Sequence, residues 1–134
     1  MKQHPIKSEK GHFVDTEGRW VDDLLAAIDR KDHMAFADFL SPDAIFRFGN
    51  GAPIRGRPEI AVAVSAFFLA LKTLQHRIED RWMLPDVAIV TGTVTYTRHD
   101  GSALQVPFAN VLKFRLSGIH EYLVFVDNSA LFVV

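Results

Sequence analysis

Asp127 and His76 are the two side chains of this sequence best suited to moving a proton. Asp127 ends an alternating run that begins at Ile119 and has one mainly apolar row. A carboxyl at the end of an apolar strand face is desolvated, which raises its pKa toward the range useful for acid/base catalysis. The same aspartate could instead cap the chain reversal into Asn128 and Ser129. We expect Asp127 to act as a catalytic acid or base.

His76 lies between Leu74 and Ile78 in another alternating run, which predicts an imidazole that faces inward. An imidazole can orient a carboxylate, act as acid or base, or donate to a substrate oxygen, although a lone inward histidine can equally be a satisfied core residue. Tyr96 and Asn110 are expected at inward positions on the strands between. Their hydroxyl and amide could bind a developing oxyanion or could be satisfied buried groups.

Several aromatic residues could form the core or line a small-molecule cavity beside these polar groups. They are Trp20, Phe46, Phe48, Trp82, Phe108 and Phe125. The histidines show no metal-ligand spacing, and no phosphate loop, dinucleotide fingerprint, serine elbow or zinc-helix motif is present. We therefore expect chemistry without a cofactor and without a metal.

Composition limits the partners and the compartment. The chain has 134 residues, 15 Lys and Arg against 16 Asp and Glu, and no cysteine. Without a basic block, nucleic acid is not an expected partner, and without cysteine no disulfide or thiolate site can form. Residues Met1 to Val14 contain no apolar stretch of signal-peptide length, and the longest uncharged apolar run, Ile60 to Leu71, is too short to span a bilayer. We expect a cytoplasmic protein that does not bind membranes.

The hydrophobic pattern predicts helices before strands. A polar N-terminal arm, residues 1–18, precedes a single domain, residues 19–134. Helical spacing predicts a helix from Trp20 to Ile28, a short helix capped by Asp32 and reaching Leu40, and an almost wholly apolar helix that opens at Pro58 and is buried on most sides. Strands are predicted over residues 44–48, 74–84, 87–98, 104–116 and 119–127. This order predicts an α+β fold, with three helices packed on one face of a strongly bent antiparallel sheet.

Alternation assigns side chains to the two faces of this sheet. Two of the predicted inward rows are Leu74, His76, Ile78, Asp80 and Trp82 in the first long strand, and Ile119, Glu121, Leu123, Phe125 and Asp127 in the last. The opposite face then carries a second apolar surface, made of Pro107, Ala109, Val111, Tyr122, Val124 and Val126. A homodimer through this outer face would cover it. The alternative cover is the N-terminal arm.

Motifs in a fixed order give the chain a family resemblance. They are a helix hairpin, Asp43-Ala44-Ile45-Phe46, Gly56-Arg57-Pro58-Glu59-Ile60, His76 on a strand, Val94-Thr95-Tyr96-Thr97 before Asp100-Gly101, Val106-Pro107-Phe108-Ala109-Asn110-Val111, and a final Phe125-Val126-Asp127. From about Trp20 to Phe132 the chain resembles the SnoaL-like members of the NTF2-like superfamily. The resemblance implies a cone-shaped α+β roll with an apolar pocket at its open end, and it implies dimers.

The resemblance leaves the activity open because this fold hosts many functions. The general-base aspartate of ketosteroid isomerases would fall at Phe48, and the Arg and Asp of limonene epoxide hydrolases at Val94 and Tyr96. Asp127 matches the general acid/base aspartate of SnoaL-like polyketide cyclases. Two classes remain: a cofactor-independent acid/base enzyme acting on a small apolar oxygenated molecule, and a noncatalytic module that binds such a ligand or only dimerises.

Overall fold

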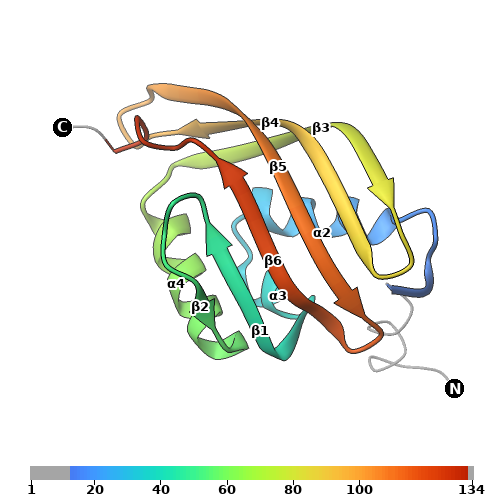
Figure 1. Ribbon diagram of the computed structural model, residues 1–134. Coiled ribbons are helices and arrows are strands. Elements are labelled where there is room, and N and C mark those ends of the chain that lie inside the picture. Colours follow the sequence, from blue (N-terminus) through green and yellow to red (C-terminus); the bar gives the residue numbers. More distant parts are fainter. Residues whose placement is uncertain (1–12, 133–134) are drawn as a thin grey trace, which may run out of the picture.

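Six strands form one sheet, and three helices lie against one of its faces (Figure 1). The structure, a computed structural model, describes residues 13–132. In chain order the elements are α2 (Arg19–Asp29), α3 (His33–Ala37), β1 (Leu40–Phe48), β2 (Ile54–Arg55), α4 (Arg57–Leu69), β3 (Thr73–Met83), β4 (Val87–Thr97), β5 (Ala103–Arg115) and β6 (Gly118–Val126). The α+β roll predicted from the sequence is confirmed. Of the predicted arm, residues 1–12 lie outside the described part, whereas Phe13 is buried in the core.

The strand order is β2-β1-β6-β5-β4-β3. Three long hairpin pairs, β3–β4, β4–β5 and β5–β6, are antiparallel, as the short turns between them require. The strand β1, however, pairs with β6 in parallel, so the sheet is mixed and not wholly antiparallel as predicted. This pairing places the first strand of the chain next to the last.

Local sequence explains the helix hairpin. In α2 the buried residues recur at helical spacing, and at α3 the Asp32 carboxylate accepts the N–H of Ala35 at 3.0 Å, which confirms it as the N-cap. The helix α3 ends at Ala37, three residues earlier than predicted. Leu40 instead starts β1, where it pairs with Ile119.

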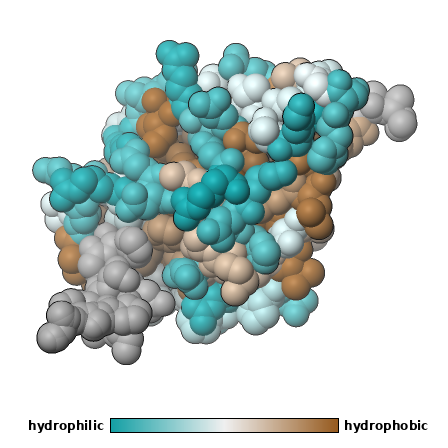
Figure 2. All heavy atoms as spheres, turned by 180° about the vertical axis from the view of Figure 1, so that it is seen from behind, coloured by the Kyte–Doolittle hydropathy of each residue, from teal (hydrophilic) through white to brown (hydrophobic). Residues whose placement is uncertain are grey.

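The helix α4 begins with a proline in its first turn, and one side of it, Ile60, Val64 and Phe68, is buried. The expectation that this helix is buried on most sides is wrong, because Val62 and Leu69 are 70% and 76% exposed. Seen from the helix side, apolar surface lies along the edge of the molecule where α4 runs (Figure 2). No helix among residues 13–132 is long and apolar enough to cross a membrane.

A β-bulge in β3 reverses which side chains of that strand face the helices. Ile78 pairs with Gly92 and Asp80 with Thr91, so Glu79 is an extra residue between them. One extra residue shifts the two-residue alternation of every later position to the other face. The predicted inward row therefore holds only as far as Ile78. Beyond it Trp82 faces outward and is 51% exposed.

A second bulge, in β6, has the same effect. Phe114 pairs with Ile119, whereas Lys113 pairs with Glu121, so His120 is the extra residue. Ile119 faces inward as predicted, but the residues after the bulge are reversed. Tyr122, Val124 and Val126 lie on the inner face, and Leu123, Phe125 and Asp127 lie on the outer face. The predicted inner row of the last strand and its predicted outer surface are wrong by this one residue.

Gly92 is required by the bulge in β3. A Cβ built on Gly92 would lie 1.9 Å from the carbonyl oxygen of Arg77, which is backbone and cannot move aside as a side chain can. The close approach of β3 to β4 thus depends on a residue without a side chain.

We predict that Gly92→Ala lowers the free energy of unfolding by on the order of 3 kcal/mol, because the added methyl group collides with the backbone of β3. Urea denaturation measures the change. The control is Gly101→Ala at the exposed β4–β5 turn, where a Cβ meets nothing within 4 Å and only the positive φ of 90° opposes it, a cost of about 1 to 2 kcal/mol. Equal losses in the two variants would contradict the prediction.

Candidate functional site

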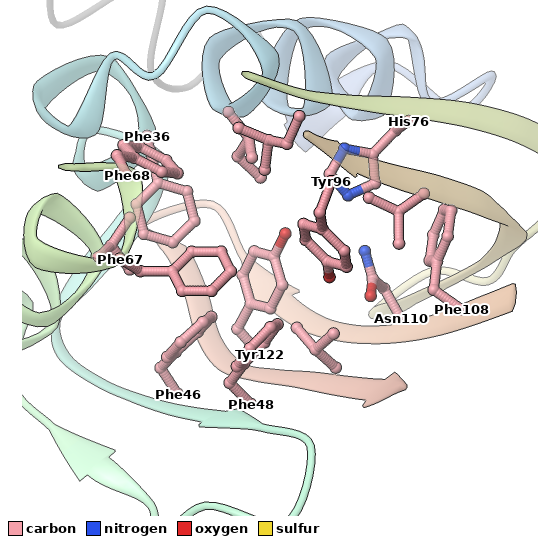
Figure 3. A pocket seen from close by; sticks show the side chains of 15 residues that line it. Phe36, Phe46, Phe48, Phe67, Phe68, His76, Tyr96, Phe108, Asn110 and Tyr122 are labelled. Atoms are coloured by element: carbon pink, nitrogen blue, oxygen red, sulfur yellow. The ribbon is translucent and has the colours of Figure 1, made fainter. Parts of the chain in front are cut away.

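A pocket of about 100 Å³ lies between the helices and the inner face of the sheet (Figure 3). Its lining residues are Ile28, Phe36, Phe46, Phe48, Val64, Phe67, Phe68, Leu74, His76, Val94, Tyr96, Phe108, Asn110, Tyr122 and Val124. Eight of these fifteen residues are phenylalanine or tyrosine, and none is Lys, Arg, Asp or Glu. The pocket is therefore an apolar, aromatic cavity with four polar side chains, a pattern typical of small-molecule sites.

His76 is held in the wall of this pocket by Asp29, the last residue of α2. The Nδ1 atom of His76 lies 2.7 Å from Oδ1 of Asp29, and the other carboxylate oxygen accepts the backbone N–H of His76 at 3.0 Å. The imidazole also packs edge-on against Phe108, with ring centroids 5.1 Å apart. Two hydrogen bonds and one ring contact thus fix both the position and the orientation of the imidazole.

This arrangement leaves the second ring nitrogen available for chemistry. A carboxylate can only accept hydrogen bonds, so Nδ1 carries a proton toward Asp29. The neutral imidazole then presents an unprotonated Nε2, which is turned toward the pocket (Figure 3). The side chains of His76 and Asp29 are 12% and 26% exposed, so the pair is partly shielded from water. A histidine oriented by a carboxylate in this way can accept or return a proton.

Two tyrosine hydroxyls point into the same cavity (Figure 3). Burial raises the pKa of Tyr96 to about 12. Burial also raises the pKa of Tyr122, and the nearby negative charge of Asp29 raises it further. Both phenols therefore stay protonated at neutral pH and can donate hydrogen bonds to a ligand oxygen.

Asn110 is the fourth polar group of the pocket and comes from β5. It is 2% exposed, and within the described part of the chain its Oδ1 atom has no hydrogen-bond partner. Its cross-strand neighbours are Val90 and Val124, which offer no side-chain donor. Tyr96, Asn110 and His76 thus lie together on the inner face of the sheet, as the alternation in the sequence predicts.

Asp127 does not lie in the pocket. Its side chain accepts a hydrogen bond from the backbone N–H of Ser129 at 3.1 Å, and its pKa is lowered because the hydroxyl and backbone of Ser129 stabilise the charged carboxylate. The expectation of a desolvated carboxyl with a raised pKa is wrong. The bulge at His120 turns this side chain outward, and Asp127 caps the chain reversal that follows β6.

Three of the six candidate aromatic residues line the cavity and three do not. Phe46, Phe48 and Phe108 are lining residues. Trp20 is buried in the core against Phe13 and Phe114, away from the pocket. Both remaining candidates, Trp82 and Phe125, follow a bulge and are more than half exposed. Their expected role in the pocket is not supported.

Sequence reasoning missed Asp29 and Tyr122. Asp29 directly follows the pocket residue Ile28 and lies one turn after the buried Leu25. That position at the edge of the apolar face was the available signal. Tyr122 was assigned to the outer face because nothing in the sequence marked the bulge at His120. Three phenylalanines of α3 and α4, Phe36, Phe67 and Phe68, complete the list of missed aromatic lining residues.

Comparison with known families agrees with this geometry. Residues 21–122 match the SnoaL-like domain, which is more than half of the chain. The chain belongs to the SnoaL-like domain family. No curated protein sequence matches it.

Solved structures of other SnoaL-like and NTF2-like proteins share the fold. A putative SnoaL-like polyketide cyclase from Jannaschia sp. is 15% identical, with a TM-score of 0.74, and the match covers 98% of this chain and 94% of that one. For an NTF2-like protein of unknown function from Burkholderia pseudomallei the identity is 16%, the TM-score 0.75, and the coverage 84% and 92%. An LEH-like epoxide hydrolase from M. tuberculosis is 15% identical, with a TM-score of 0.72 and coverage of 83% and 82%. At these identities the likeness concerns the fold alone.

We predict that neither tyrosine ionises in the folded protein below about pH 11, because Tyr96 and Tyr122, the only tyrosines, are buried. Their native pKa values exceed the unfolded value of about 10, so the unfolded state loses its phenol protons first. The free energy of unfolding should therefore fall as the pH rises from about 10 to about 12. Tyrosinate absorbance at 295 nm in folded and denatured protein measures this. A folded-state midpoint near pH 10 would contradict it.

Proposed function

We propose that this SnoaL-like protein is a cofactor-independent general acid/base enzyme of the isomerase, cyclase, dehydratase or hydrolase type. Its substrate is a small, largely apolar, oxygenated molecule, and His76 is the residue that transfers the proton. The proposal rests on one observation, the 2.7 Å contact between Nδ1 of His76 and the Asp29 carboxylate, which leaves Nε2 facing the pocket.

In the proposed reaction Nε2 of His76 removes a proton from a carbon or oxygen of the substrate. The imidazolium that forms is stabilised by Asp29, which keeps its hydrogen bond to Nδ1. Negative charge develops on a substrate oxygen, and the phenol groups of Tyr96 and Tyr122 donate hydrogen bonds to it. The protonated Nε2 then returns the proton at a second position of the substrate or to a leaving hydroxyl, which restores the neutral imidazole.

The catalytic pair proposed from the sequence, Asp127 with His76, is thereby revised to Asp29 with His76. Asp127 is exposed, its carboxylate accepts a hydrogen bond from Ser129, and it does not line the pocket. Among the similar structures, a putative polyketide cyclase and an epoxide hydrolase-like protein carry names of enzymes, which is compatible with catalysis on this fold. A noncatalytic binding module remains the second candidate, and the predominantly apolar lining favours it.

We predict that the protein accelerates hydrogen–deuterium exchange at the α-carbons of a small neutral ketone such as cyclopentanone in D2O, followed by proton NMR. His76→Gln should reduce the acceleration about 10²- to 10⁴-fold, because it removes the base while keeping a polar side chain. Asp29→Asn should also slow the exchange, because the amide no longer stabilises the imidazolium.

Asp127→Asn is the matched control and should exchange at the wild-type rate, since its carboxylate does not face the cavity. Full activity of His76→Gln would remove this residue from catalysis. Saturable binding of the ketone without any acceleration by the wild-type protein would instead favour the binding module.

We also propose a homodimer through the outer face of the sheet, the face turned away from the helices. Its exposed or half-buried apolar residues differ from those predicted, because Tyr122, Val124 and Val126 face inward. They are Ile45, Trp82, Ile89, Pro107, Ala109, Val111, Leu123 and Phe125. Cross-strand pairing joins Trp82, Ile89, Val111 and Leu123 into one row across four strands. A continuous apolar surface of this kind is costly to leave in water.

We predict a dimer in light scattering at micromolar concentration, and a monomer for Phe125→Lys, which adds a charge to this surface. A dimer of usual size buries roughly 800 Å² per partner. Val62→Lys is the matched control, because this exposed apolar residue lies on α4, in the helix layer at the opposite face. A monomeric wild-type protein would contradict the proposed dimer.

A further inference from the structure

The buried amide oxygen of Asn110 is the feature of the pocket that the proton-transfer chemistry leaves unused. Asn110 is only 2% exposed, and its Oδ1 atom accepts no hydrogen bond from any residue within 13–132. A buried acceptor without a partner costs about 1–3 kcal/mol of stability. Native proteins rarely keep such a group unless a ligand or water completes it.

The surroundings of Asn110 define what can complete this hydrogen bond. The side chain points into the cavity beside Phe108, near His76 and Tyr96 (Figure 3). Since Oδ1 is an acceptor, its partner must carry an O–H or N–H donor. The lining contains no positively charged side chain other than His76 when protonated, so a carboxylate or phosphate ligand would be desolvated without a fixed counter-charge.

The remaining walls favour a flat ring. Phenylalanine and tyrosine rings come from α3, α4, β1, β4, β5 and β6 and surround the cavity on several sides. Aromatic ligands make edge-to-face and offset contacts with such walls. The volume of about 100 Å³ is smaller than the roughly 150 Å³ of an apolar cavity that binds benzene, so it limits the ligand to about one small ring.

We propose that Asn110 is a specificity-determining residue that selects an uncharged hydroxylated ring compound by accepting a hydrogen bond from its free hydroxyl at Oδ1. The inference deepens the proposed function, on which it rests for the identity of the pocket as the substrate site. It assigns binding to Asn110 and proton transfer to His76, and the two assignments are separable by experiment.

The test compares two probes of nearly equal shape, phenol and toluene, of which only phenol has a hydroxyl donor. Dissociation constants are measured by titration of ¹⁵N-labelled protein, followed through backbone amide shifts. The ratio of the toluene to the phenol constant is determined for the wild type and for Asn110→Leu. Because each variant is compared with itself, the different water solubilities of the probes cancel.

We expect this ratio to be about tenfold lower in Asn110→Leu, as the loss of one neutral hydrogen bond implies. Val124→Ala, which alters the wall next to Asn110 without touching the amide, should keep the wild-type ratio. An unchanged ratio in Asn110→Leu overturns the proposal. So does a ratio that changes as much in Val124→Ala.

Thermal unfolding of the ligand-free variants provides a second, independent measurement. Asn110→Leu should be at least as stable as the wild type, because it replaces an unpaired buried amide by an apolar group of similar size. A strongly destabilised variant would reveal a structural partner for the amide and would overturn the proposal.

His76→Gln separates this inference from the proposed function. If His76→Gln exchanges cyclopentanone normally while Asn110→Leu loses the phenol preference, the acid/base proposal fails and the hydroxyl subsite stands. The opposite pair of results leaves the proposed function standing and overturns the subsite.

Discussion

The candidate site depends on which side chains of each strand point toward the helices. Side chains alternate with a period of two, so one inserted residue exchanges the inner and outer rows of everything that follows. The extra residues Glu79 in β3 and His120 in β6 do this twice. They bring Tyr122 and Val124 into the pocket and turn Trp82 and Asp127 away from it.

Most of the fold could be predicted because it follows from local patterns. The helix α2, the start of α4 and the four long strands lie within one residue of their predicted bounds, and Asp32 caps α3 as its side chain implies. The parallel pairing of β1 with β6 could not be predicted in this way. It joins segments about eighty residues apart, and no turn residue specifies it. The pairing also explains why α3 ends early, because Leu40 belongs to β1 and pairs with Ile119 of β6.

The site could be predicted only where a strand is regular. His76 precedes the bulge of β3, and Tyr96 and Asn110 lie on strands paired without a register shift at those positions, so simple alternation placed all three correctly. Asp127 follows a bulge and was placed wrongly. A bulge depends on tertiary contacts, and its only local signal here is Gly92, opposite Ile78, where a Cβ would strike the carbonyl of Arg77.

The location of the proposed base changes what the pocket can do. A catalytic Asp127 would have put a negative charge in the cavity. The Asp29 carboxylate instead bonds to the side of the imidazole turned away from the cavity and does not line the cavity itself. The cavity itself then contains no formal charge while His76 is neutral. Its polar groups are one imidazole, two phenol donors and one amide acceptor, set in aromatic walls. In such an apolar environment each hydrogen bond is stronger than in water, so few polar groups suffice to orient a neutral molecule.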